Sequence, residues 1–184
     1  MKSLTTVYFK INTNTVLDMS SMFSHLTDLE KLDIQLFTDK VKYMDYMFYS
    51  SEKLTSITIH SFNANSVKSM NYMFAKCTKL EEINIENFET NSLVEMKNMF
   101  ESCTSLKSVN LNNFHTKNVE NLYYVFANCA SLTELNLDSF ETENVINMDG
   151  LFFGCTSLNK INFRGMNTKN TKSKNFVFGN CNKE

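Results

Sequence analysis

The sequence predicts an α/β solenoid, a right-handed stack of short coils with a parallel β-sheet on one face and short helices or 3₁₀ turns on the other. Two observations carry this prediction: a fixed repeat of about 26 residues, and two hydrophobic periodicities inside each repeat. A third is consistent with it. The 184 residues include 4 glycines and no proline, which disfavours folds built on glycine-rich phosphate loops or proline corners.

The repeat is visible in a column of phenylalanines and a column of cysteines. The phenylalanines are 25 residues apart once and 26 residues apart thereafter, and the cysteines keep the same 26-residue spacing. The two columns are Phe23, Phe48, Phe74, Phe100, Phe126, Phe152 and Phe178, and Cys77, Cys103, Cys129, Cys155 and Cys181. A fixed period between 20 and 50 residues indicates a solenoid or another repeat array.

Two periodicities share each unit. The segments 83–85, 109–111 and 135–137 alternate apolar, polar and apolar residues, as a strand with one buried face does. Val119, Leu122 and Val125 are spaced by three, which predicts a short helix or 3₁₀ turn on the other side. A unit of about 26 residues is too short for a strand followed by a long helix. It fits one coil of a leucine-rich-repeat-like solenoid.

We expect a single solenoid domain with distinct ends. Residues 1–18 form an N-terminal cap or partial repeat, residues 19–176 form six repeats, and residues 177–184 form a further partial repeat. In the last full unit Thr171 and Lys174 stand where earlier units have apolar residues, which suits a terminal coil that faces water. No apolar run approaches membrane-spanning length, so we expect no membrane insertion, and no signal peptide is visible in this chain.

Charge is low overall but unevenly distributed. The formal net charge of −2 argues against nucleic-acid binding, which requires a basic face. Residues 81–149 carry 12 acidic and 3 basic side chains, whereas residues 150–184 carry 6 basic and 1 acidic. Such a polarised module can steer its encounter with a charged partner.

The cysteine column has two interpretations. Aligned thiols could bind a soft metal or form disulfides, or they could fill a buried turn position as small, weakly polar residues. Leu26 and Ser51 occupy the same position in the first two units, so the position does not require sulfur. The sequence has no Cys-x-x-Cys pair, and the histidines fall at different repeat positions. We therefore predict buried free thiols, with no metal and no cofactor.

Outward-facing residues of the strands form the candidate binding surface. Asn84, Asn110, Asn136 and Asn162 each lie between two inward-facing residues, so their amides either form a ladder along the stack or offer a polar strip to a partner. The residues on either side differ from coil to coil, as in a recognition surface or any unconstrained solvent face. The predicted partner-binding patch on the concave face is Glu82, Asn84, Glu86, Ser108, Asn110, Asn112, Glu134, Asn136 and Asp138.

A column of tyrosines lies on the other side of each unit. Tyr46, Tyr72 and Tyr124 share one repeat position. Exposed aromatic residues can anchor a partner. They can equally pack over the neighbouring coil with the hydroxyl in water, and the sequence leaves both alternatives open.

The repeat resembles a known family. Its pattern, Met-x-x-Met-Phe-x-x-Cys-Thr-x-Leu-x-x-Ile-Asn-Ile-x-x-Phe-x-Thr-x-x-x-Val, is similar to that of the BspA-like leucine-rich-repeat surface proteins, and above all to the mycoplasma-type lipoprotein repeat. Matching units begin at Met22, Met47, Met73, Met99, Val125 and Leu151. The resemblance implies an extracellular, cell-surface protein that adheres to host matrix or to other cells. It brings no catalytic residues.

We therefore expect a non-enzymatic module that binds a protein or a glycan through its concave sheet face. No motif places a base beside a nucleophile, so no enzyme activity is predicted. Two alternatives remain open: a structural spacer or antigenic surface unit without a dedicated ligand, and an intracellular scaffold, in which free thiols are normal. Replacing Glu82, Glu86 and Glu134 by lysine should abolish binding through this face without unfolding the chain.

Overall fold

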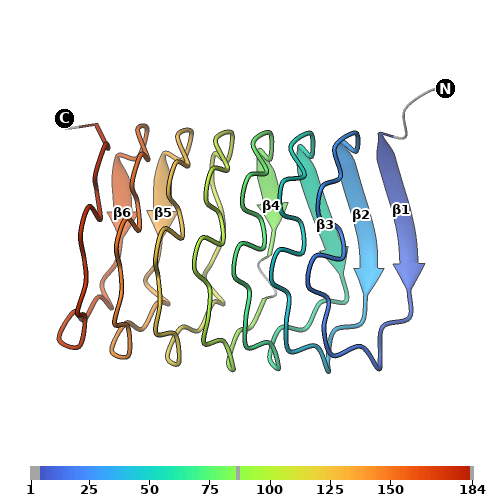
Figure 1. Cartoon of the computed structure of the whole chain (residues 1–184), viewed down its shortest axis with the longest axis horizontal. Coiled ribbons are helices and arrows are strands. Elements are labelled where there is room, and N and C mark those ends of the chain that lie inside the picture. Colours follow the sequence, from blue (N-terminus) through green and yellow to red (C-terminus); the bar gives the residue numbers. More distant parts are fainter. Residues whose placement is uncertain (1–4, 86–87, 183–184) are drawn as a thin grey trace.

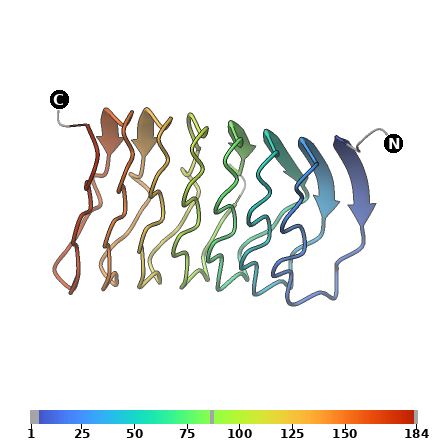
Figure 2. The ribbon, with the colours of Figure 1, turned by 45° about the horizontal axis from the view of Figure 1, so that its top comes forward.

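The computed structural model describes residues 5–85 and 88–182, and it shows a solenoid whose coils lie side by side in sequence order (Figure 1). The strands run side by side in the same direction, and the two ends of the chain lie at opposite ends of the row (Figures 1 and 2). Paired strands are offset by 25 or 26 residues, for example Thr6 with Lys31 and Ser56 with Glu82. The predicted repeat is therefore the structural unit.

One long side of the solenoid is a parallel sheet in two parts. Strands β1 to β4 form a four-stranded part, and strands β5 and β6 form a two-stranded part. The strands are β1 (Thr6–Ile11), β2 (Lys31–Leu36), β3 (Ser56–His60), β4 (Glu82–Asn84), β5 (Glu134–Asn136) and β6 (Lys160–Asn162). In β2 the apolar residues Leu32, Ile34 and Leu36 point inward and the polar residues between them are more exposed, as the period-two pattern predicts.

The opposite side differs from the prediction of helices or 3₁₀ turns. The structure has no helix within its described residues; each coil here consists of successive tight turns, which we call the turn strip. In residues 44–51, alternate N–H groups donate to the next coil, as from Phe48 to the Met73 carbonyl at 2.8 Å, while others close turns within the coil. A helix would direct all of these groups along its own axis. Here half of them join neighbouring coils instead.

Backbone conformation explains why the turn strip is not helical. Two residues in each strip have a positive φ four positions apart, such as Tyr46 and Ser50 (φ 58° and 57°) or Gly150 and Gly154 (φ 60° and 71°). A left-handed residue at every fourth position interrupts the right-handed helix. The apolar residues still recur at intervals of three and four, so the same core positions are buried without a helix.

The core lies between the sheet and the turn strips. Phenylalanine rings stack along the whole axis, with neighbouring centroids 5.3 Å apart for Phe48 and Phe74 and 5.4 Å apart for Phe74 and Phe100. Leucine, isoleucine, valine and methionine side chains fill the space around the rings. Because each coil buries its apolar face only against its neighbours, stability is shared between adjacent coils.

A column of buried threonines also ties the coils together. The Thr38 hydroxyl donates to the Asn63 carbonyl at 2.8 Å and accepts from the Asn63 N–H at 2.7 Å. The buried members are Thr13, Thr38, Thr90, Thr116 and Thr142. Ala64 occupies the same repeat position in the third coil, so the link that a threonine makes to the following coil cannot form there.

Candidate functional site

The sheet is interrupted at its centre. Residues 108–110 lie between β4 and β5 but do not form a strand, although Val109, Asn110 and Leu111 have the alternation that predicts one. The N–H groups of residues 108–111 donate no hydrogen bond to the part of the chain that the structure describes. The cross-coil links just before the gap are long, at 3.5 Å from Lys107 N to the Glu81 carbonyl and from Thr133 N to the Lys107 carbonyl.

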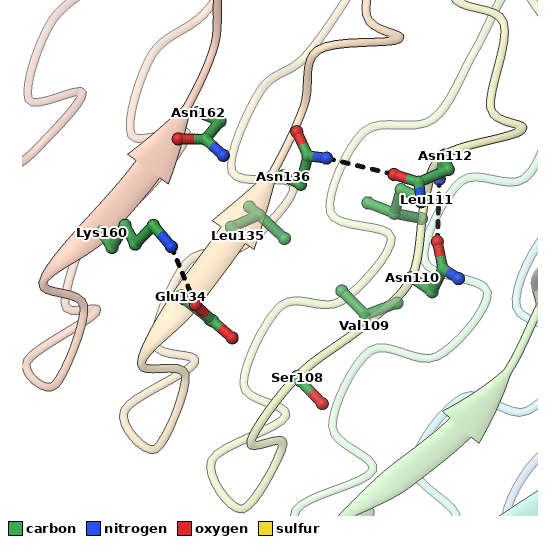
Figure 3. Close-up of a pocket in the computed structure, with 10 residues that line it drawn as sticks. All are labelled: Ser108, Val109, Asn110, Leu111, Asn112, Glu134, Leu135, Asn136, Lys160 and Asn162. Atoms are coloured by element: carbon green, nitrogen blue, oxygen red, sulfur yellow. Dashed lines mark hydrogen bonds and ion pairs between the residues drawn. The ribbon is translucent and has the colours of Figure 1, made fainter.

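A shallow pocket of about 340 Å³ lies beside this interruption. Its walls are amides, a hydroxyl and one pair of opposite charges, and its floor is apolar (Figure 3). The residues that line it are Ser108, Val109, Asn110, Leu111, Asn112, Glu134, Leu135, Asn136, Lys160 and Asn162. A small apolar floor surrounded by convergent polar groups is typical of a recognition site.

Hydrogen bonds fix the amides of this pocket. The Asn110 side-chain oxygen accepts from the Asn112 N–H at 3.1 Å, and the Asn136 oxygen accepts in the same way from the Asp138 N–H at 3.1 Å. The Asn136 amide nitrogen then donates to the Asn112 side-chain oxygen at 3.2 Å (Figure 3). At this point the amide-to-amide bond between coils therefore joins Asn136 to Asn112 rather than to Asn110, its neighbour in the expected column.

The structure brings together most of the predicted patch. Five of the predicted residues line the pocket: Ser108, Asn110, Asn112, Glu134 and Asn136. A second hollow of about 260 Å³ adjoins it, lined in part by Glu82, Asn84 and Asn110. Asp138 lies at the edge, where its carboxylate accepts from the Arg164 N–H at 3.1 Å. Glu86 lies outside the described residues.

Opposite charges cross the site between coils. Lys160 lies 3.6 Å from the Glu134 carboxylate, and Arg164 lies 3.8 Å from that of Asp138. All four side chains are substantially exposed or at the surface, so these pairs orient the groups more than they stabilise the fold. On the acidic side of the gap, the hydrogen bond from Lys107 to Glu81 at 2.7 Å lowers the pKa of the Glu81 carboxyl.

The predicted patch omitted two polar residues of the pocket, Lys160 and Asn162. A signal for both was present, because Lys160 follows Glu134 and Asn162 follows Asn136 by one 26-residue period. The predicted patch was confined to the central coils and left this last full repeat out. The apolar floor residues were predicted only as core.

The cysteines lie in the turn strips, away from this pocket. All five are free, and each thiol donates to the carbonyl of a phenylalanine 29 residues earlier, as from Cys103 Sγ to the Phe74 oxygen at 3.1 Å. The Ser51 hydroxyl makes the equivalent bond to Phe23 at 3.0 Å. Burial raises the pKa of the Cys77 and Cys155 thiols to about 12. The column therefore acts as a row of structural hydrogen-bond donors.

Within residues 5–85 and 88–182, no cluster of histidine, cysteine, aspartate and glutamate side chains has the arrangement that a metal ion needs. The same residues contain no helix with the length and hydrophobicity that crossing a membrane requires.

A family described as Mycoplasma protein of unknown function, DUF285, matches residues 2–109 and 80–184. The chain belongs to this family. No curated protein sequence matches the chain. Among solved structures, it is similar to the crystal structure of the T. pallidum leucine rich repeat protein (TpLRR), with a TM-score of 0.60 and 19% sequence identity over 87% of this chain and 70% of that chain. At this identity the likeness shows the fold alone.

The comparisons confirm the resemblance on which the sequence interpretation depends. Membership of the DUF285 family and the leucine-rich-repeat-like solenoid together identify a BspA-like repeat protein. The fold is that of a leucine-rich-repeat-like solenoid. The parallel solenoid is confirmed, whereas the helical face is not.

Proposed function

We propose that this DUF285 chain is a non-enzymatic, cell-surface adhesion protein that binds a protein or glycan partner through its sheet face. The main support for the proposal is the pocket at the sheet interruption, where the N–H groups of residues 108–111 have no acceptor among the described residues and the asparagine side chains are exposed. Leucine-rich-repeat-like solenoids commonly use an extended face of this kind to bind partners.

The chemistry of the pocket favours a polar partner surface. Amide and hydroxyl groups donate and accept hydrogen bonds, and the side chains of Ser108, Asn110 and Asn112 present them on one exposed edge. Glu82 and Glu134 add negative charge on either side of the gap. The neighbouring bonds within the site hold these groups in place before a partner arrives, which reduces the entropy lost on binding.

Surface plasmon resonance against a panel of extracellular-matrix and serum proteins and immobilised glycans would test the proposal. The wild-type chain would be compared with a variant that carries Glu82→Lys and Glu134→Lys. Glu141→Lys with Glu143→Lys is the matched control, because it makes the same change in net charge at exposed residues outside the pocket. Thermal melting by circular dichroism would show that every variant is folded.

Saturable binding that the pocket variant loses and the control retains would support a sheet-face adhesin and identify its partner class. Binding that both variants retain would place the contact elsewhere on the molecule. The absence of saturable binding to any member of the panel would contradict the proposal and favour a structural spacer or an intracellular scaffold. Locating the natural protein by surface labelling of intact cells would then separate these two alternatives.

A further inference from the structure

The turn strips carry an aromatic surface on the side of the solenoid away from the sheet. Six of the seven tyrosines fall in the strips. Five of them, together with one histidine, form the set that we call the tyrosine band: His25, Tyr46, Tyr49, Tyr72, Tyr123 and Tyr124. Tyr46 and Tyr123 are 40% and 36% exposed, so the band is not a covered part of the core.

Ring contacts order the first half of the band. Tyr46 and Tyr72 stack with centroids 4.8 Å apart and an interplanar angle of 4°. Tyr49 meets the edge of Tyr46 at 5.4 Å, and His25 meets Tyr49 at 5.5 Å. Residues from three successive coils therefore hold each other in one orientation, and a partner would meet rings that are already ordered.

The structure already shows how this surface accepts a cation. The Lys76 ammonium lies over the Tyr49 ring, 5.3 Å from its centroid. Contact with Tyr49 is the largest cause that raises the pKa of Lys76, and the carboxylates of Glu101 and Glu52 add to it. Carboxylates thus act on the same cation that lies over the Tyr49 ring.

Asn98 interrupts the band at its centre. It occupies the repeat position of Tyr72 and Tyr124, has the same positive φ at 56°, and is only 4% exposed. Its amide nitrogen donates to Glu101 at 3.0 Å, but its side-chain oxygen has no hydrogen-bond partner among the described residues. A buried acceptor without a donor destabilises a fold, so a tyrosine here would serve stability better than asparagine does.

We propose that the tyrosine band is a second interaction surface, and that it binds an extended arginine- and lysine-rich segment of a partner protein. The ring faces attract guanidinium and ammonium groups, and the carboxylates of Glu52 and Glu101 supply the opposite charge. The acidic character of residues 81–149, with 12 acidic and 3 basic side chains, draws the same kind of partner to the middle of the chain.

Tyrosine fluorescence offers a direct measurement, because the chain has no tryptophan and all but one tyrosine lies in the turn strips. The probe is an alternating arginine–serine peptide, with a glutamate–serine peptide of equal length as its control. We expect a saturable change in emission with the arginine peptide, weakened by added salt, and none with the glutamate peptide. Equal responses to both peptides, or no response to either, would overturn the proposal.

Two pairs of variants separate ring recognition from simple charge attraction. Tyr46→Leu and Tyr72→Leu should each weaken peptide binding roughly two- to fivefold, whereas Tyr46→Phe and Tyr72→Phe should retain it because the ring remains. For these, binding is read by calorimetry so that the loss of a fluorophore does not matter. Leucine variants that bind as well as the wild type would contradict the proposal. The proposal would also be contradicted if the wild-type chain bound a chitin oligosaccharide but did not bind the arginine peptide.

Asn98→Tyr gives a further check on the same surface. We expect the variant to melt at a higher temperature, because it removes the unpaired buried acceptor. We also expect it to bind the peptide more tightly, because it adds a ring at the centre of the band and frees the Glu101 carboxylate from its amide donor. A variant that binds the peptide no more tightly than the wild type would contradict the proposal. The Glu82→Lys, Glu134→Lys variant should still bind the arginine peptide saturably, with no more than a modest, salt-sensitive loss from the changed long-range charge, so failure of the sheet-face proposal would leave this one intact.

Discussion

The two long sides of the solenoid follow one repeat but differ in continuity. On the turn side, parallel bridges link every coil to the next, from Asp18 through Glu95 to Ser173. On the sheet side, the ladder runs through β4 and begins again only at β5. The turn strips therefore hold the coils together along the whole axis. The sheet is free to open at one point and to expose a pocket there without dividing the molecule.

The two sides also differ in how strongly the fold constrains their sequence. In the second to sixth turn strips, two left-handed residues, a buried thiol or hydroxyl and a core phenylalanine all occur in register. The sheet needs only the alternation of inward and outward residues, and its outward positions are free to vary. The outward residues of the sheet face can therefore change without loss of the fold.

The largest expected effect on the turn side is a loss of folding stability at alkaline pH. Burial raises the thiol pKa of Cys77 and Cys155 from 9.0 to about 12, and it raises those of Cys103 and Cys129 well above 9.0. The unfolded chain loses these protons at lower pH than the folded one, so stability is intact below pH 9 and falls between pH 9 and about 12. Each thiol contributes at most about 1.4 kcal/mol per pH unit.

Urea unfolding at a series of pH values would measure this loss. The control replaces Cys77, Cys103, Cys129 and Cys155 by serine, the residue that already makes the same bond at Ser51. Its stability should depend much less on pH over this window. Curves of equal slope for the two proteins would show that other groups cause the alkaline transition.

Removing one ring from the phenylalanine column should cost about 3–5 kcal/mol in the middle of the stack. Phe100 is fully buried between Phe74 and Phe126, at centroid distances of 5.4 and 5.6 Å, so Phe100→Ala leaves a cavity. Phe178 in the last coil is 55% exposed, and Phe178→Ala should cost no more than about 1–2 kcal/mol. Chemical denaturation measures both changes, and similar losses would refute the nearest-neighbour account of stability.

Hydrogen exchange compares the two sides directly. The amide protons of Val109, Asn110 and Leu111 have no acceptor among the described residues, whereas the Phe100 N–H donates to the Val125 carbonyl at 2.9 Å in the neighbouring turn strip. We expect exchange roughly 100-fold faster in the sheet gap than in the strip. The Leu137 N–H, which donates to Asn162 at 2.7 Å, is the control on the sheet side. Equal protection at Val109 and Leu137 would mean that the sheet is closed in solution.

The smallest expected effect is a gain in folding stability. Ala64→Thr would restore the missing member of the threonine column and supply a hydroxyl to the next coil, as Thr38 does for Asn63. We expect stabilisation by about 0.5–1.5 kcal/mol in thermal unfolding. Ala64→Val has nearly the same shape without a hydroxyl and should give no such gain. A loss with both variants would show that the core has closed around the alanine.

The sequence was sufficient to predict the repeat and its inward-facing residues. Phenylalanine and cysteine columns at a constant spacing define the register, and burial of Ile83, Leu111 and Leu135 follows from strand alternation. The prediction of a helical face was wrong, because apolar residues three positions apart suit a helix and a chain of tight turns equally well. The left-handed positions were a usable signal, since they hold residues such as Asn98 and Gly150 and never a β-branched one.

The position of the candidate pocket was predictable from the sequence, but its form was not. Stacked coils bring equivalent outward residues together, so the placement of Asn110 beside Asn136 follows from the repeat alone. The gap does not follow from it, because Val109-Asn110-Leu111 has the same pattern as Leu135-Asn136-Leu137, which takes part in the ladder. Nothing in the structure explains why this strand alone is not formed.

The direction of the cross-coil hydrogen bonds gives the molecule an electrical polarity. In the turn strips most of the N–H groups that leave a coil, such as those of Phe23, Phe48 and Phe74, point to carbonyls of the following coil, and fewer point back. These peptide dipoles add along the solenoid axis as they do in a helix, with the positive end at the C-terminal coil. Residues 150–182 carry five basic and no acidic side chains at that same end. The two ends of the solenoid therefore differ in electrostatic potential, and in an applied field or near a charged surface the axis has a preferred orientation.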